Sequence, residues 1–359
     1  MPFEISAAAY SAVDRFVIAT KQFQLRRDDR QACRAHPRWQ PLTKAELGRI
    51  DRRDRYGYTI YKNMNGTGPL EYYLTDAPYK TRLLPLLNPL NHRPSSLNAD
   101  TDFSDKNYHE LFMEGIVFPR AVVRRIAGQF YSGDRTPIAP EEALALMAPY
   151  DELVFKATVE SGHGHGIRLA SAAEYRDVYL SHGQDYVVQE RVRQHPVLAG
   201  FNPSSVNVIR VTTLYWRGHV YVLGGIFRAG APGAFCDHEN KGGQTYLTIP
   251  LDEEGNILPR ALDVDYFHAY DDCRGIPLRG RIPHYDLLKK QAADGHSRYP
   301  HYGIIGWDFT VDENENLLCM EFNTKYPGLV GTQCALGPVL ARESVDGVPL
   351  FRELMDAVK

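Results

Sequence analysis

The sequence predicts an α+β fold. Residues 205–229 form two apolar, β-branched runs around the dipeptide Arg217-Gly218, and a two-residue turn between such runs predicts a β-hairpin. A second pair of apolar runs surrounds a polar turn and predicts another hairpin over residues 303–323. Helical stretches lie between the predicted strands without a regular strand–helix–strand order, so we expect α+β architecture.

Length and composition are those of a globular protein with more than one lobe. A chain of 359 residues is too long for one simple core. With 43% hydrophobic and 24% charged residues, disorder is not expected. No apolar run reaches the roughly 18 residues of a membrane span, and the N-terminus lacks the pattern of a signal peptide. Scattered cysteines without metal-binding spacing predict free thiols and a cytoplasmic location: Cys33, Cys236, Cys273, Cys319 and Cys334.

Charge is distributed unevenly along the chain. Residues 1–60 hold 12 of the 41 Lys and Arg but only 7 of the 44 Asp and Glu, a balance of +5 within a chain of net charge −3. This basic region suits contact with an anionic substrate or, peripherally, with a membrane surface; a solvated helix face is the alternative. We expect no nucleic-acid partner, and the sequence leaves the oligomeric state open.

Residues 1–100 are expected to form a mostly helical region. Apolar positions recur every three to four residues near its start, at Ala8, Ala12, Phe16 and Ala19. Thr43 and Glu46 form a capping box for a helix over residues 42–50. The charged segment 26–41 contains two prolines and predicts a bend. Residues 61–100 predict an irregular, packed connection with leucines that require burial: Leu83, Leu84, Leu86, Leu87 and Leu90.

From residue 101 onward, helices and strands mix. The expected elements are a helix at 104–113 with Ser104 as N-cap, a strand or hairpin at 115–131, a helix at 140–147, a strand–turn–strand unit at 153–170, a helix at 172–181, a strand at 186–192, the hairpin at 205–229 and a helix at 284–300. We place three parts at residues 1–100, 101–190 and 191–359.

The hairpin at 303–323 carries a candidate metal site. Asp308 lies 13 positions before Glu321, so a five- or six-residue turn brings the two carboxylates opposite each other. Glu321 and Asn323 are two residues apart and share one face of a strand. Two carboxylates and an amide oxygen form the all-oxygen donor set that suits Mg²⁺ beside nucleotide phosphates. A surface hairpin with outward-facing acids is the alternative.

Lys156 lies in an apolar strand directly before the glycine-rich turn Ser161–Gly166. Glycines let a backbone approach a phosphate closely, and a lysine on a strand supplies a fixed positive charge. The order differs from the G-x-x-x-x-G-K-[ST] loop and from a dinucleotide fingerprint, because the lysine precedes the glycines and another strand follows. A plain tight turn is the alternative for the loop. For His163 and His165 the two alternatives are a metal-binding pair and solvated side chains.

Arg210 and Arg228 lie in apolar strands of the 205–229 hairpin. A buried guanidinium needs an anion, so each is a candidate to clamp phosphate or to stabilise charge on a transferred phosphoryl group. An ion pair with a nearby acid is the alternative for both. Residues 237–243, DHENKGG, form a second polar loop next to this hairpin.

The order of these motifs resembles the ATP-grasp superfamily, and more narrowly its sugar-transfer-associated group, which is found with cell-surface polysaccharide genes. The resemblance covers about residues 101–340. It is carried by SDK at 104–106, VFK at 154–156, the SGHGHG loop, VVQERVRQHP at 187–196, NPSSVNVIRVTT at 202–213, the DHENKGG loop, GWDF at 306–309 and CMEFNTKYPG at 319–328. It implies two α+β lobes that grip ATP between them, after a mostly helical N-terminal region.

The resemblance also implies roles for individual residues. Phosphate contacts would come from Lys106 and Lys156, under a lid formed by Gly162, His163, Gly164, His165 and Gly166. Adenine would meet the backbone around Gln189, Glu190 and Val192. Mg²⁺ would be held by Asp308, Glu321 and Asn323, and the γ-phosphate or acyl phosphate by Arg210, with Arg228 and Lys156 as further catalytic groups. Gln194-His195 occupies the region of the expected ribose-binding acid, so His195 is included among the nucleotide contacts.

These expectations describe an ATP-dependent carboxylate–amine ligase that acts through an acyl phosphate. The expected partners are ATP, Mg²⁺ and small-molecule carboxylate and amine substrates, and the family implies a sugar acid or an amino-acid-like molecule. A kinase for a hydroxyl acceptor and a non-catalytic nucleotide-binding partner of a glycosyltransferase system are the alternatives. We expect Asp308→Asn and Glu321→Gln to abolish ATP turnover while the fold stays intact.

Overall fold

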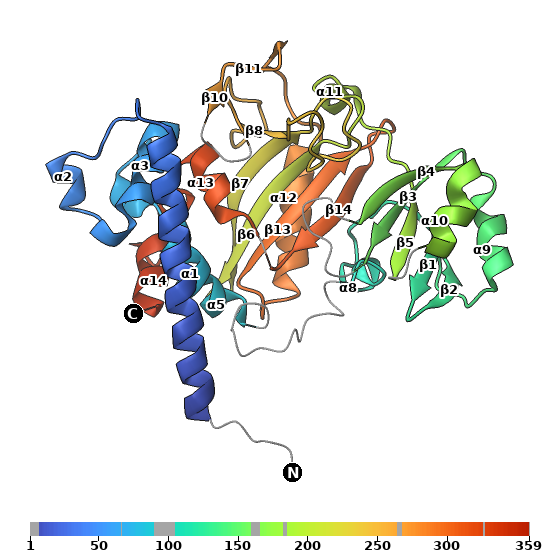
Figure 1. The fold of residues 1–359 in the computed structure, drawn as a ribbon, viewed down its shortest axis with the longest axis horizontal. Helices are drawn as coiled ribbons and strands as arrows, with labels where there is room; N and C mark the ends of the chain where they lie inside the picture. The colour runs from blue at the N-terminus through green and yellow to red at the C-terminus, as the bar shows by residue number, and fades with distance from the viewer. Residues whose placement is uncertain are drawn as a thin grey trace.

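The computed structural model describes residues 7–65, 67–89, 105–158, 166–181, 185–263, 268–325 and 327–358. These residues form a helical N-terminal region and two large antiparallel sheets (Figure 1). The α+β class predicted from the sequence is confirmed. None of the described helices is both long enough and apolar enough to cross a membrane. The boundaries placed at residues 100 and 190 remain predictions.

The N-terminal region is organised around the long helix α1 (Ala7–Ala35), which packs against α3 (Arg55–Met64) and α4 (Asp76–Pro78). The predicted bend over residues 26–41 is wrong for its first ten residues, because α1 continues to Ala35. Arg, Gln and Ala favour a helix, and Arg26 anchors this part of α1 by an ion pair with Asp54 (Nε–Oδ1 2.6 Å). The chain turns only at the first proline.

Short helical segments occupy residues 44–87. They are α2 (Lys44–Leu47), η1 (Arg52–Asp54), η2 (Leu70–Tyr72), η3 (Tyr79–Leu83) and α5 (Leu84–Leu87). The predicted capping box is confirmed, since the Glu46 N–H donates to Thr43 Oγ1 (3.2 Å) and the Thr43 N–H to Glu46 Oε2 (2.6 Å). Residues 61–89 are more helical than predicted, and their leucines are buried except for Leu86, which is 42% exposed. Leu90 lies outside the described residues.

The first sheet has five strands in the spatial order β2-β1-β5-β3-β4. The strands are β1 (Ala121–Ile126), β2 (Gln129–Ser132), β3 (Glu152–Ala157), β4 (Ile167–Ser171) and β5 (Tyr186–Glu190). Helices α9 (Pro140–Met147) and α10 (Tyr175–Ser181), with η4 (Ala172–Glu174), cover it, and the short α8 (His109–Phe112) precedes it. Met147, Phe155 and Val188 are fully buried in its core. These elements lie near their predicted positions, except that α8 begins at His109 with Tyr108 at its N-cap, so the helix start and N-cap predicted at Ser104 are wrong.

The second sheet has seven strands in the order β10-β9-β8-β7-β6-β13-β14. The strands are β6 (Val208–Trp216), β7 (His219–Ala229), β8 (Leu247–Pro250), β9 (Ala261–Leu262), β10 (Ala269–Tyr270), β13 (Ile304–Val311) and β14 (Leu317–Asn323). The predicted β6–β7 hairpin is confirmed. Its turn residues Arg217 and Gly218 have φ of 48° and 87°, the positive values that a two-residue hairpin turn requires.

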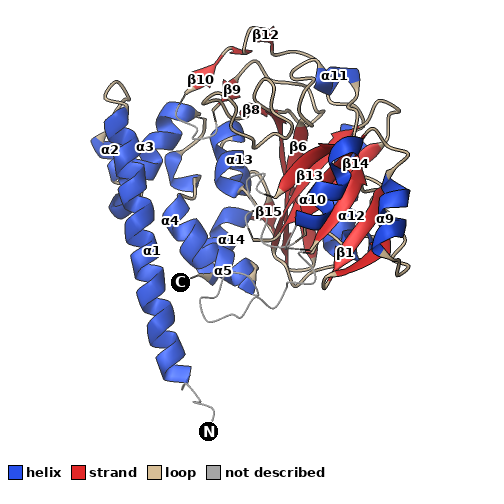
Figure 2. Ribbon diagram, turned by 45° about the vertical axis from the view of Figure 1, so that its right-hand side comes forward, coloured by secondary structure: helices blue, strands red, loops and turns tan. Residues whose placement is uncertain are grey.

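Helices cover both faces of the second sheet (Figure 2). Helix α12 (Tyr285–Ser297) packs on the face that carries Ile209 and Trp307. Helices α13 (Leu329–Leu336) and α14 (Leu350–Ala357) and the N-terminal region pack on the other face. Because strand residues alternate, Arg210 and Asp308 point away from α12. The remaining elements are α11 (Pro196–Ala199), β11 (Asp272–Cys273), β12 (Ile276–Pro277), η5 (Val339–Ala341), β15 (Ser344–Val345) and β16 (Val348–Pro349).

Candidate functional site

A cleft lies between the two sheets and has an empty volume of about 880 Å³, its open mouth included. One wall comes from β3, β4 and β5 and contains Val154, Lys156, Ile167 and Gln189. The other comes from β6, β13 and β14 and contains Val208, Asp308, Met320 and Glu321. Lys106, Pro119, Val206 and residues 190–192 and 235–238 complete the lining. A cleft with apolar walls and a few charged groups suits a small-molecule ligand.

Lys156 is a buried lysine on the wall of this cleft. It lies on β3 between β4 and β5, and it is only 7% exposed. Burial lowers the pKa of Lys156 to about 8; Glu321 opposes this shift and Lys106 adds to it. An ammonium group held in such a place is a candidate partner for an anionic ligand.

Lys106 reaches the same place from the segment before α8. Its backbone N–H donates to the carbonyl of Thr158, just after β3, at 3.2 Å. Its Nζ lies 3.7 Å from Oε2 of Glu321. Two lysines from the five-stranded side therefore face a carboxylate from the seven-stranded side.

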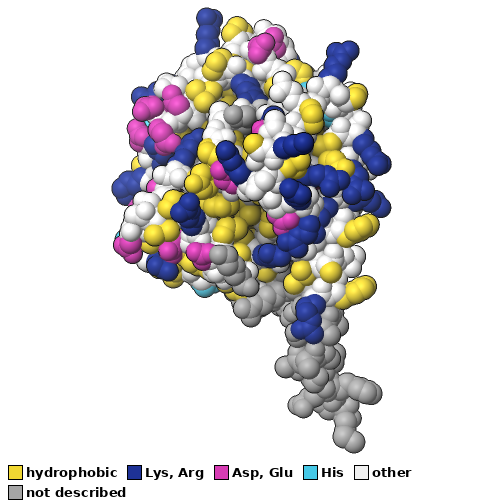
Figure 3. Space-filling view, turned by 90° about the vertical axis from the view of Figure 1, so that its left-hand side faces the viewer, with side chains coloured by type: hydrophobic (Ala, Val, Ile, Leu, Met, Phe, Trp, Pro, Cys, Tyr) yellow, Lys and Arg dark blue, Asp and Glu magenta, His cyan; other side chains and the backbone are white. Residues whose placement is uncertain are grey.

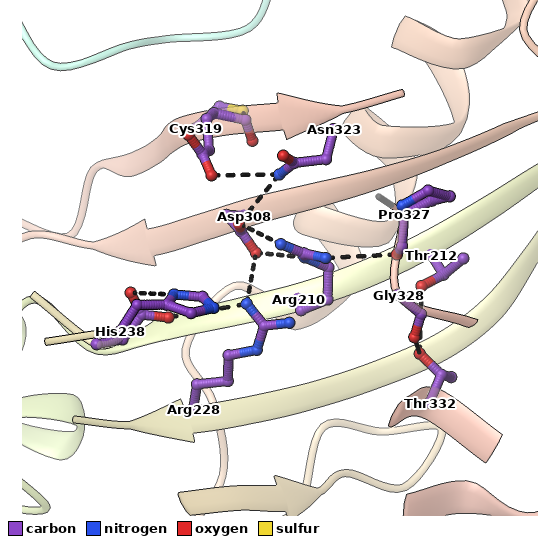
Figure 4. Close-up of polar contacts among 12 residues, drawn as sticks. Arg210, Thr212, Arg228, His238, Asp308, Cys319, Asn323, Pro327, Gly328 and Thr332 are labelled. Carbon is purple, nitrogen blue, oxygen red and sulfur yellow. Dashed lines mark hydrogen bonds and ion pairs between the residues drawn. The ribbon is translucent and has the colours of Figure 1, made fainter. Parts of the chain in front are cut away.

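The carboxylates meet in the β13–β14 hairpin as the sequence predicts. Asp308 is paired directly with Glu321. The Asn323 Nδ2 lies 3.4 Å from Asp308 Oδ2 and 3.3 Å from Glu321 Oε1, so the three side chains share one face (Figure 4). Burial acts to raise the pKa of Glu321, but Lys106, Arg210 and the hydrogen bond from Asn323 hold it below its ordinary value. Glu321 is therefore charged at neutral pH.

This group fits a hard divalent cation. Asp308 and Glu321 offer carboxylate oxygens, and both line the cleft. Within the described parts of the chain, no set of three His, Cys, Asp or Glu side chains is placed to hold a metal. Asn323 would be the third protein donor, but it turns Nδ2 toward both carboxylates here, so its amide would have to turn over to offer Oδ1, with oxygens from a ligand completing the shell. That division of ligands is the one Mg²⁺ prefers beside phosphates.

Arg210 forms a buried, bidentate ion pair with Asp308. Its Nε and Nη2 donate to Oδ1 and Oδ2 at 2.5 and 2.6 Å, and both side chains are 5% exposed. Its Nη1 donates to the carbonyl of Pro327 at 3.4 Å. Arg210 is not part of the cleft lining. Of the two sequence-based alternatives, the ion pair is the one observed, and a direct contact with the γ-phosphate gains no support.

Arg228 extends the charged cluster beneath the cleft. Its Nη1 lies 3.8 Å from Asp308 Oδ1 and 3.8 Å from Asp237 Oδ2, and His238 Nδ1 lies 3.1 Å from Asp237 Oδ1 (Figure 4). Burial alone acts to raise the pKa of Asp237, but His238 and Arg228 together lower it. Asp237 thus lies between His238 and Arg228, and Asp308 lies between Arg228 and Arg210.

The segment expected to meet adenine lies at one end of the cleft. Gln189, Glu190 and Val192 all line it. Gln189 is fixed by pairing with β3 and by a hydrogen bond from its Nε2 to the carbonyl of Pro119 (3.0 Å). Glu190 accepts hydrogen bonds on Oε1 from Arg120 (3.0 Å) and from the Tyr150 hydroxyl (2.9 Å). Gln189 and Glu190 are therefore each held in place at the cleft.

His195 is not among the cleft-lining residues. Its Nδ1 accepts a hydrogen bond from the Val197 N–H at 3.2 Å and so caps α11. Its Nε2 lies 3.4 Å from Glu315 Oε1. The predicted contact between His195 and the nucleotide gains no support from this position.

The glycine-rich turn is described only at its end. Gly166 has a φ of 79°, and its carbonyl accepts from the Ala157 N–H at 2.8 Å. Gly162, His163, Gly164 and His165 lie outside the described residues, as does Ser104. The apolar wall of the cleft was not predicted from the sequence. A signal was present, because Val154 and Val208 precede Lys156 and Arg210 by two residues, the spacing of side chains on one strand face.

Two antiparallel sheets that face each other across a cleft are the architecture expected of the ATP-grasp class. The sequence pattern described as "Sugar-transfer associated ATP-grasp" matches residues 145–347, more than half of the chain. The chain therefore belongs to the sugar-transfer-associated ATP-grasp family. No curated protein matches it.

Solved structures that resemble the chain are distant. Biotin carboxylase from Campylobacter jejuni is 15% identical, with 70% of this chain and 45% of that chain covered and a TM-score of 0.43. The VanG D-Ala:D-Ser ligase from Enterococcus faecalis is 15% identical, with coverage of 72% and 61% and a TM-score of 0.41. The ATP-grasp ligase PsnB, complexed with a minimal precursor, Mg and ADP, is 14% identical, with coverage of 73% and 61% and a TM-score of 0.36. The matches span less than two thirds of each of these chains.

Proposed function

We propose that the cleft binds ATP with Mg²⁺ and that the protein is an ATP-dependent carboxylate–amine ligase. The observation that carries this proposal is the meeting of Lys106 and Lys156 with Asp308 and Glu321 in one cleft. A triphosphate needs cationic side chains along its oxygens and a place for its metal ion, and this cleft offers both. Membership of the ATP-grasp class makes a nucleotide the expected ligand.

Each wall of the cleft has a distinct task in this proposal. Val154, Ile167 and Met320 provide an apolar slot for the base, and the backbone of residues 189–192 meets its polar edge. Lys106 and Lys156 neutralise phosphate oxygens. Because Lys156 is buried, its charge acts in a poorly screened environment, where its attraction for phosphate is stronger than at an exposed site.

Asp308, Glu321 and Asn323 would hold Mg²⁺, which offsets charge on the phosphoryl group when bound. Arg210 and Arg228 act through Asp308, whose carboxylate they hold in place. We therefore assign both arginines as positioning residues. In each case the protein contributes orientation and electrostatic stabilisation, the main sources of catalysis in phosphoryl transfer.

The proposed reaction has two steps. An oxygen of the donor carboxylate attacks the γ-phosphorus of ATP, and the bond from that phosphorus to the β–γ bridging oxygen breaks. ADP departs, and the carboxylate has become an acyl phosphate. The nitrogen of the amine then attacks the acyl carbon, phosphate departs with the bonding electrons, and the amine proton passes to solvent. The cleft walls keep water from the acyl phosphate in between. We propose a sugar acid or an amino-acid-like molecule as substrate, used in cell-surface polysaccharide or small-molecule biosynthesis.

The test is a screen for ADP formation with pools of amino acids, uronic acids and amines. Phosphate released in step with a new amide supports the ligase. A stable phosphorylated acceptor would establish a kinase instead, and tight ATP binding without turnover in any pool would point to a non-catalytic role. Glu321→Gln should lose the activity, whereas Glu313→Gln, an exposed acid in the turn of the same hairpin, should keep it.

A further inference from the structure

The outward face of α1 carries an unusual stripe of side chains. Phe16 and Phe23 are 74% and 70% exposed. They are followed by three exposed arginines, and the five side chains recur at steps of seven, four, three and four residues: Phe16, Phe23, Arg27, Arg30 and Arg34. Such steps place them along one side of a helix. The stripe is therefore apolar toward the N-terminal end of α1 and basic toward its C-terminal end.

The basic end of the stripe is enlarged by α3. Arg30 lies 5.3 Å and Arg55 4.6 Å from the centre of the Tyr56 ring, and Arg55 also donates to its hydroxyl at 3.0 Å. The hydrogen bond from Arg55, with the charges of Arg55, Arg30 and Arg34, lowers the pKa of Tyr56. In the part of the chain that the structure describes, no carboxylate forms an ion pair with Arg27, Arg30, Arg34 or Arg55, whereas nearby Arg26 and Arg53 are paired.

This gathering of unpaired cations is unfavourable in the isolated protein, because like charges repel. It becomes favourable when an anionic surface is present. Within residues 15–35, Asp28 is the one exposed acid. Figure 3 shows Lys and Arg side chains gathered on the side of the molecule that carries α1, with hydrophobic side chains nearer its N-terminal end.

We infer that this face of α1 docks on an anionic phospholipid surface. Phe16 and Phe23 would enter the boundary between headgroups and acyl chains, and Arg27, Arg30, Arg34 and Arg55 would meet lipid phosphates. An anionic bilayer satisfies both ends of the stripe at once. A second copy would bring the same arginines face to face in a parallel pair or set them against the phenylalanines in an antiparallel one, and a nucleic acid would leave both phenylalanines in water.

The position of α1 fits this mode of docking. Its N-terminal end projects beyond the rest of the protein in two views (Figures 1 and 2). The five-stranded sheet, which forms one wall of the cleft, lies beyond the β14 edge of the seven-stranded sheet, on the right of Figure 1, whereas α1 lies on the left. Docking through α1 thus leaves the cleft accessible. The inference is independent of the reaction proposed for that cleft.

The experiment is flotation of the full chain with phosphatidylcholine vesicles, with and without phosphatidylglycerol, at low and high salt. We expect binding to the anionic vesicles only, weakened by salt. The triple variant Arg27→Gln/Arg30→Gln/Arg34→Gln should lower the partition coefficient about a hundredfold, since one basic residue near the surface contributes roughly fivefold. Phe16→Ser/Phe23→Ser should lower it by about tenfold or more. The matched control Leu287→Ser/Lys290→Gln, at exposed positions of α12, should bind like the wild type.

Several results would overturn the inference. They are equal binding to neutral vesicles, no binding to anionic vesicles, and unchanged binding of either stripe variant when circular dichroism shows that the variants are folded. A dimer in sedimentation that Phe16→Ser/Phe23→Ser dissociates, without vesicle binding, would assign the stripe to a second copy. Binding to a nucleic acid that the arginine variant loses and the phenylalanine variant keeps, again without vesicle binding, would assign it to that partner.

Discussion

Replacing Asp308 by Asn tests whether the buried ion pair with Arg210 supports the fold as well as the site. The sequence alone predicts that Asp308→Asn leaves the fold intact, but the structure indicates otherwise. Both oxygens of Asp308 accept from Arg210, and Arg228 lies 3.8 Å from the same carboxylate. Asparagine keeps the shape of the side chain but removes the negative charge that lies between two buried guanidinium groups.

The magnitude follows from this burial. Removing one partner of a buried ion pair costs about 3–5 kcal/mol, because the other charge is left uncompensated. Asp237 remains beside Arg228, so the cost should lie at the lower end, about 3 kcal/mol. That is a large part of the roughly 5–15 kcal/mol that stabilises a folded domain, and it should lower Tm by about 4 °C when the 359 residues unfold together.

The assay is urea unfolding of the ligand-free protein, followed by circular dichroism. Glu321→Gln is the control: its side chain is 32% exposed and its nearest cation, Lys106, lies 3.7 Å away, so it should lose less than about 1 kcal/mol. The double variant Arg210→Met/Asp308→Asn should regain part of the loss, because it removes both members of the pair. A free energy of unfolding of Asp308→Asn equal to that of the wild type would refute this cost. Simple additivity of the separate Arg210→Met and Asp308→Asn effects in the double variant would refute the coupling between the two side chains.

Four further predictions concern single residues. Glu321→Gln should lower ATP turnover by about a hundredfold or more, measured as ADP release; activity near wild type would remove it from the site. Burial holds the pKa of Lys156 at about 8, so its charge is present below that pH and lost above it. ATP affinity measured by calorimetry should therefore fall between about pH 8 and pH 10. Lys156→Arg should abolish that fall, because arginine stays charged over this range. Gly306→Ala should destabilise the protein by about 1–3 kcal/mol in urea unfolding, because a Cβ there would lie 2.5 Å from the Pro327 carbonyl oxygen. An unchanged urea concentration at the midpoint of unfolding would contradict this packing. His195→Ala should lower the free energy of unfolding by about 1 kcal/mol, because the cap of α11 is lost, and should leave the Kd for ATP within about twofold. A larger loss of ATP affinity would support the contact between His195 and the nucleotide that the sequence predicts.

Features that depend on near neighbours could be predicted from the sequence. The β13–β14 hairpin is one, because a polar turn between two apolar runs fixes which residues lie opposite each other. Asp308 and Glu321 therefore came together as predicted. The capping box at Thr43 and the two-residue turn at Arg217 are also local, and the residue types alone specify them.

Features that depend on distant partners could not be predicted. Asp308 and Arg210 are 98 positions apart, and nothing in the pattern around Arg210 distinguishes a phosphate ligand from an ion-pair partner. The segment before Pro37 was predicted as a bend from its charges, yet its tertiary contact with Asp54 and its helix propensity keep it in α1. His195 was placed by analogy of position, whereas its orientation is set by α11 and Glu315.

The way the chain crosses between the two sheets defines where they can rotate. Arg191 forms an ion pair with Glu152 of the first sheet, and the carbonyl of Arg193 accepts from the Glu313 N–H of the second at 2.9 Å, so Val192 alone separates the two attachments. Another crossing lies just after Val117, whose carbonyl accepts from the Cys319 N–H at 2.8 Å, and a third lies between Glu110, which pairs with Arg124 of the first sheet, and Phe112, whose carbonyl accepts from the Tyr299 hydroxyl beside the second. Together these crossings mark the line along which the two sheets are joined. Any change in the angle between the sheets must be absorbed by backbone torsions beside it, and groups close to that line move least.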